Sequence, residues 1–152
     1  MGTSGHEPFE NDTAADWAAF AVDADDEHAY FLRPIRLALT LFNESETPDN
    51  CYETCVRGEE CVAAADAMAA FSGEGSTRVP YDVREYFEGC ATPIFTVDDL
   101  QAALKAVVFL VERSAMRQNW LSTGVESWLW IDSMDDLRRR LERALEVRRM
   151  AN

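Results

Sequence analysis

Apolar residues recur at helical spacing through most of this chain. Two stripes at i, i+3, i+4 and i+7 each mark one buried helix face: Ala14, Trp17, Ala18 and Ala21, and then Ile35, Ala38, Leu39 and Phe42. Further helices are predicted over residues 51–71 and 80–88. Gly58 weakens the first of these by about 1 kcal/mol relative to alanine, so residues 51–71 form either one helix or two pieces.

The longest apolar segment, residues 102–111, is interrupted only by Lys105. A helix that is apolar on every side must be enclosed by other helices, so residues 97–121 are predicted to form a buried central helix. Thr96 and Ser133 each precede Asp-Asp-Leu by two positions, a capping-box pattern that places helix starts at residues 97 and 133. Residues 133–150 are predicted to be an amphipathic helix with inward leucines and outward arginines, Arg140 among them.

These elements predict an all-α fold. The 152 residues suffice for one domain with an adequate core. We expect a single compact bundle of six to seven helices around the central helix, preceded by an irregular but ordered arm over residues 1–11. The chain shows no signal peptide and no apolar run of the roughly 20 residues that cross a bilayer. A cytoplasmic location with no membrane association is therefore expected.

Charge is distributed unevenly along the chain. Residues 1–99 carry 21 acidic and 5 basic residues, a net charge of −16, whereas residues 100–152 carry 7 acidic and 9 basic residues, a net charge of +2. The acidic half disfavours nucleic acid as a partner, because phosphates require a basic surface. It favours either plain solubility or a basic protein partner.

The N-terminal arm carries a long motif, Met-Gly-x-x-Gly-x-x-Pro-Phe-Glu-Asn-Asp. It resembles the opening of a bacterial family, DUF4259, whose members are small acidic proteins without an assigned activity. The motif residues shared with that family are Gly2, Gly5, Pro8, Phe9, Asn11 and Asp12, whereas Ser4 and Glu7 depart from it. A family pattern near the C-terminus matches Trp120, Gly124, Trp128, Asp136, Leu137, Arg140 and Leu141.

Asp66 is the one acidic residue in the run Ala-Ala-Ala-Asp-Ala-Met-Ala-Ala. The resemblance implies a recurring acid at this position. In the structural interpretation Asp66 is buried and paired with an arginine or with N–H groups of the arm. In the functional interpretation it is a site carboxylate with a raised pKa. We favour the structural interpretation, because buried acids usually have partners.

No catalytic motif is present, and no cofactor is expected. The candidate metal ligands are four cysteines: Cys51, Cys55, Cys61 and Cys90. A C-x₃-C pair on a helix places two thiols on one face, but zinc sites more often use C-x₂-C knuckles, so buried free thiols are the favoured interpretation.

The sequence thus favours a non-enzymatic protein-binding module that captures a basic partner, in the manner of an immunity protein that neutralises a toxin. The alternatives are a metal- or thiol-dependent enzyme that uses the cysteines, and a DNA mimic with regularly spaced carboxylates. Trp120, Trp128 and Trp130 are expected to cluster at one turn, beside the arginine-rich helix. That helix could also dock on the acidic half of another copy and form a homodimer.

Overall fold

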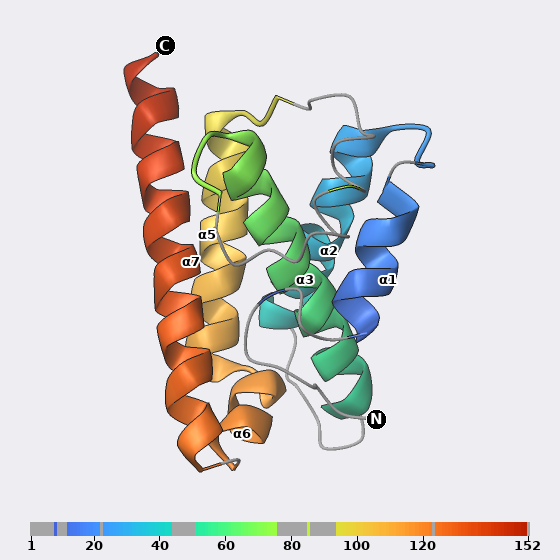
Figure 1. The fold of residues 1–152 in the computed structure, drawn as a ribbon, viewed down its shortest axis with the longest axis vertical. Coiled ribbons are helices and arrows are strands. Elements are labelled where there is room, and N and C mark those ends of the chain that lie inside the picture. Colours follow the sequence, from blue (N-terminus) through green and yellow to red (C-terminus); the bar gives the residue numbers. More distant parts are fainter. Residues whose placement is uncertain are drawn as a thin grey trace.

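A computed structural model of the chain describes residues 8, 12–21, 23–43, 51–75, 85, 94–122 and 124–151. In these residues all regular structure is helical, which confirms the predicted all-α class. The helices are α1 (Asp12–Ala21), α2 (Glu27–Asn43), α3 (Cys51–Phe71), α5 (Val97–Arg113), α6 (Ala115–Leu121) and α7 (Val125–Met150) (Figure 1). The helix predicted over 80–88 lies outside the described residues except for Glu85. None of the described helices is long and apolar enough to cross a membrane.

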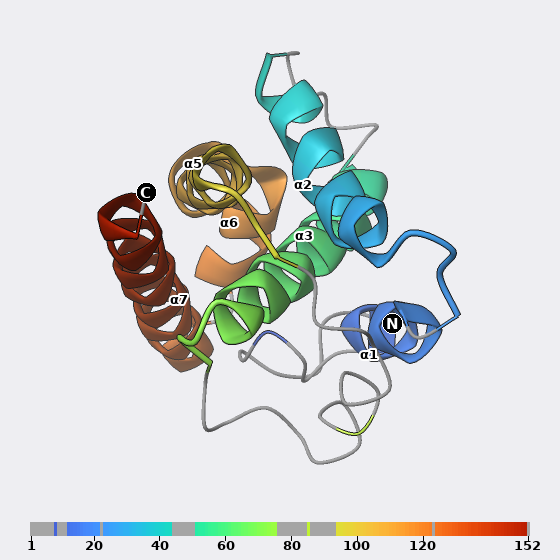
Figure 2. The same ribbon diagram turned by 90° about the horizontal axis from the view of Figure 1, so that it is seen from above.

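The most enclosed helix is α3. It packs against α1, α2, α5, α6 and α7, and Figure 2 shows it between the α1–α2 side and the α5–α7 side. Residues 61–69 are all buried, and most are alanine. Small side chains allow neighbouring helices to approach from every direction, so this alanine-rich segment occupies the centre that was predicted for residues 97–121.

The predicted central helix is divided in two. α5 ends at Arg113 and α6 begins at Ala115. Between them Ser114 is buried and extended, and its hydroxyl donates to the Leu110 carbonyl at 2.6 Å and accepts from the Arg117 N–H at 3.0 Å. A serine side chain that binds nearby backbone groups competes with the helix ladder. This is why the helix predicted over residues 97–121 is interrupted at Ser114.

α5 is amphipathic rather than enclosed on every side. Its inward face buries Leu100, Ala103, Ala106, Val107, Phe109 and Leu110. Gln101, Lys105 and Glu112 are exposed on the other face. The predicted burial of Val107 and Phe109 is confirmed, but one side of the helix meets solvent.

One of the two predicted capping boxes is confirmed. At the start of α5, the Thr96 hydroxyl accepts from the Asp99 N–H at 3.1 Å, and the Asp99 carboxylate accepts from the Thr96 N–H at 2.9 Å. The prediction at Ser133 is wrong, because Ser133 is buried within α7, which begins eight residues earlier, at Val125. The preceding turn is made by Gly124, whose φ of 71° favours glycine.

The buried faces of α1 and α2 agree with the predicted stripes wherever the side chains are described. α3 is one continuous helix through Gly58, not two pieces. A Cβ atom at Gly58 would lie 2.8 Å from the Met116 sulfur, so this glycine permits the close approach of α6. Pro34 lies inside α2.

Candidate functional site

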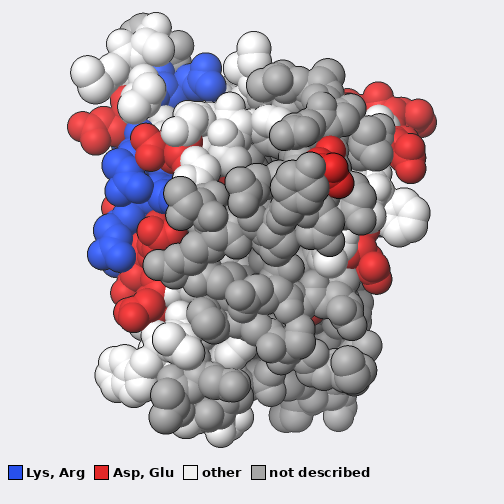
Figure 3. All heavy atoms as spheres, in the orientation of Figure 1, with Lys and Arg blue, Asp and Glu red and all other residues white. Residues whose placement is uncertain are grey.

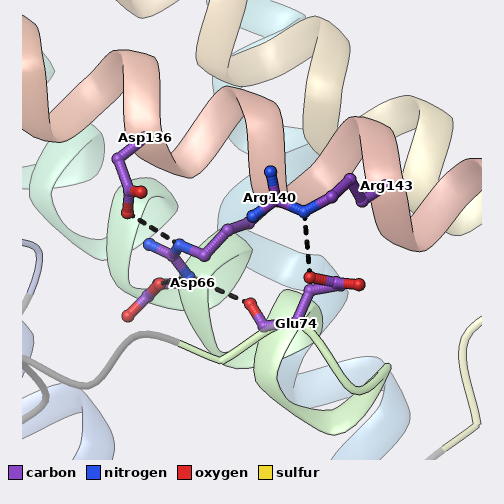
Figure 4. A network of polar contacts seen from close by, with 5 residues as sticks. All are labelled: Asp66, Glu74, Asp136, Arg140 and Arg143. Atoms are coloured by element: carbon purple, nitrogen blue, oxygen red, sulfur yellow. Dashed lines mark hydrogen bonds and ion pairs between the residues drawn. The ribbon is translucent and has the colours of Figure 1, made fainter.

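The main polar cluster of the described structure joins α3 to α7 around Arg140 (Figure 4). The Arg140 guanidinium contacts the Asp66 carboxylate, and their side chains are only 5% and 1% exposed. Its Nε donates to the Asp136 carboxylate at 2.8 Å, and an Nη donates to the Glu74 backbone carbonyl at 3.3 Å. One arginine therefore ties together α3, the turn that follows it, and its own helix.

The electrostatics of this cluster favour a charged Arg140. Burial alone would lower the pKa of Arg140, but the charges and hydrogen bonds of Asp66 and Asp136 outweigh it and raise that pKa above its ordinary value. The predicted pairing of buried Asp66 with an arginine is confirmed. The predicted outward orientation of Arg140 is wrong, because Arg140 lies in the buried stripe with Leu137, Leu141 and Ala144.

Two neighbouring arginines of α7 also have partners within the chain. Arg143 donates to the Glu74 carboxylate at 3.1 Å, and Arg138 lies 3.7 Å from the Asp135 carboxylate. Much of the basic charge of α7 is therefore neutralised locally. A carboxylate held between two helices by a buried guanidinium is suited to fixing the helices rather than to proton transfer.

A second cluster, which no pattern in the sequence indicated, joins α2 to α5. The His28 Nε2 lies 2.8 Å from the Asp99 carboxylate, and the His28 ring stacks on Phe95 with centroids 5.4 Å apart. Burial would raise the pKa of Asp99, but hydrogen bonds from Thr96 and His28 outweigh it and lower the pKa. These residues are 71 positions apart in sequence, so periodicity alone could not bring them together.

The predicted tryptophan cluster is only partly present. Trp120 and Trp130 are buried and stack nearly parallel, with centroids 6.1 Å apart. Trp128 is 71% exposed. Two positions along a helix turn a side chain by about 200°, which places Trp128 and Trp130 on nearly opposite faces of α7.

The described structure offers little support for a cysteine site. Cys61 is a free, buried thiol on α3, and burial raises its pKa to about 12. The thiolate is the form that attacks electrophiles and binds metals, so burial disfavours both roles for Cys61. Cys51 and Cys55 lie on the first turns of α3 with side chains outside the described residues, and Cys90 lies outside them altogether. Among the described residues, no three His, Cys, Asp or Glu side chains are grouped to hold a metal.

The arm is largely outside the described residues. This applies to Gly2, Gly5, Phe9 and Asn11, whereas Pro8 is buried. Asp12 is the first residue of α1, and its side chain is not among those described.

Exposed carboxylates gather at the edge of the molecule opposite α7. They belong to Asp16 on α1 and to Asp23, Asp25 and Asp26 in the turn before α2. Figure 3 shows acidic side chains at this edge, whereas basic and acidic side chains alternate along α7. Within the described part of the chain, no ion pair joins these four carboxylates to a basic side chain.

Comparison with known protein families gives a match over most of the chain. Residues 2–130 match the model of a family described as a domain of unknown function, DUF4259. The matched range includes Asp66 and both clustered tryptophans but ends before Arg140. Neither a curated protein nor a solved structure matches the chain.

Proposed function

Because this chain belongs to the DUF4259 family, a domain of unknown function, we propose its function from its own surface: it is a non-enzymatic module that binds a basic protein. The acidic edge formed by Asp16, Asp23, Asp25 and Asp26 is the binding surface. Like charges on one edge of a protein attract an oppositely charged partner within about a Debye length and speed its association.

The proposal rests on one observation: within the described residues, the carboxylates of the acidic edge form no ion pair with a basic side chain. Arg138, Arg140 and Arg143 form ion pairs with acidic residues of α7, of α3 and of the turn that follows α3. The carboxylates of the acidic edge receive no such partner in the described structure. A partner protein that supplied lysine or arginine there would relieve their mutual repulsion.

An immunity protein that neutralises a basic toxin in the bacterial cytoplasm is the concrete form of this proposal. Such a protein needs fast capture of its target, which an acidic surface provides. The free thiol of Cys61 suits a reducing compartment.

The test is affinity capture from a lysate of the native host with three forms of the protein. The first is the wild type, and the second carries Asp16→Asn, Asp23→Asn and Asp25→Asn. The third is a matched control with Asp98→Asn, Glu112→Gln and Asp132→Asn, which removes the same charge from exposed positions elsewhere.

We expect the wild type and the control to retain one basic protein at physiological ionic strength, and the acidic-edge variant to lose it. The affinity of the purified pair should fall as salt is raised. Capture of no protein, or equal capture by the acidic-edge variant, would overturn the proposal.

A further inference from the structure

A shallow groove of about 600 Å³ runs between α5 and α7 near the end of α7. Leu104 and Leu145 contribute apolar surface to it. Glu142, Glu146 and Arg149 contribute charges of both signs, and Met150 lies at its end with 81% of its surface exposed. The groove therefore combines an apolar surface, an exposed apolar side chain, and both signs of charge.

The α7 residues in this groove form one face of the helix. Positions 142, 145, 146, 149 and 150 follow the spacing i, i+3, i+4, i+7 and i+8. Val147, one residue after Glu146, is also largely exposed. This face carries an acidic residue near one end and a basic residue near the other. Two copies of the face are therefore complementary in charge when the helices pack antiparallel.

We propose that a second copy of this chain occupies the groove, with the two α7 helices antiparallel about a twofold axis. The proposed register sets Glu142 opposite Arg149 of the second copy. The twofold axis repeats this contact, so a single register forms two ion pairs.

This interface is separate from the acidic edge proposed to bind a basic protein, because α7 lies at the opposite side of the molecule from α1 (Figure 2). The two proposals can therefore fail independently. A contact limited to one groove and the end of one helix lies at the small end of protein interfaces, so the dimer should depend on protein concentration.

The test is sedimentation velocity of the full chain over a range of protein concentrations. The variants are Glu142→Arg and Arg149→Glu, with Arg139→Glu as the control, because Arg139 is exposed on α7 but absent from the groove. Each groove variant places two like-charged pairs across the twofold axis and should weaken association at least tenfold. The control should dimerise like the wild type.

The decisive measurement mixes the two groove variants in equal amounts. One chain then has arginine at both positions and the other has glutamate at both, so the mixed pair regains two ion pairs and should sediment as a dimer. A wild type that stays monomeric at all concentrations would overturn the proposal. A mixture of the two groove variants that remains monomeric would also overturn it. The same holds if Arg139→Glu weakens association while Arg149→Glu leaves it unchanged.

Discussion

Replacing Arg140 with methionine removes the positive charge that Asp66, Asp136 and the Glu74 carbonyl share. A methionine side chain is similar to the aliphatic part of Arg140, which packs in the buried face of α7. The change is therefore chiefly electrostatic. Asp66 then remains almost fully buried without its counter-charge. Asp136 is 42% exposed and can be solvated instead.

The size of the effect follows from that difference in burial. Removing one partner of a buried ion pair costs about 3–5 kcal/mol, because the other charge is left uncompensated. The exposed Asp136 contact adds only about 0.5 kcal/mol. For a urea slope of about 2 kcal/mol/M, the unfolding midpoint should fall by about 2 M.

The assay is equilibrium urea unfolding followed by far-ultraviolet circular dichroism. Arg139→Met is the matched control, since Arg139 is the exposed preceding residue of the same helix and should change stability by no more than about 0.5 kcal/mol. In a double-mutant cycle with Asp66→Asn, the two sites should couple by at least about 2 kcal/mol. An Arg140→Met variant as stable as the control would refute the structural role given to this pair.

Three further predictions concern other parts of the structure. The lowered pKa of Asp99 means that its stabilisation is present above the ordinary carboxyl pKa of 3.8 and is lost as pH falls through the folded-state pKa. Asp99→Asn should thus lower Tm by a constant amount above about pH 5, and by less as the pH falls through the folded-state pKa of Asp99; a difference in Tm that does not shrink in acid would contradict this. Cys61, with a pKa of about 12, should resist iodoacetamide in the folded protein and react only in denaturant, as mass spectrometry can show; rapid labelling of the native chain would disprove its burial. Gly58→Val should destabilise the chain by about 1–3 kcal/mol in urea unfolding through overpacking, because even a Cβ atom would meet the Met116 sulfur at 2.8 Å; unchanged stability would show that the Met116 side chain or α6 moves aside.

Local patterns in the sequence predicted the local structure well. The bounds of α3, the buried stripe of α1 and the capping box of Thr96 all follow from residues within one or two helical turns of each other. The same reasoning predicts one continuous helix over residues 97–121, because nothing in the apolar pattern identifies Ser114 as a helix cap. A serine ends a helix only where its hydroxyl finds backbone partners.

The contacts between helices were harder to predict. The sequence indicated that Asp66 would require an arginine, but the chain holds 13 of them. The signal that selects Arg140 is its spacing, since 137, 140, 141 and 144 follow i, i+3, i+4 and i+7 and therefore share the buried face. The pairing of His28 with Asp99 had no comparable signal, because it depends on how α2 packs against α5.

The pairing of charges within α7 distinguishes the two surfaces for which partners are proposed. A surface of one sign, such as Asp16, Asp23 and Asp25, repels its own copy, so a basic protein is the partner proposed there. A surface that carries Glu142, Glu146 and Arg149 presents both signs at helical spacing, so a second copy of the chain is the partner proposed there. Because Arg138, Arg140 and Arg143 are committed to acids close to them, the arginine-rich face has less charge left to dock on the acidic edge of another copy. The homodimer expected from the sequence, in which that face binds the acidic half, stays a prediction, and the association proposed through the ends of the α7 helices would leave the acidic edge open.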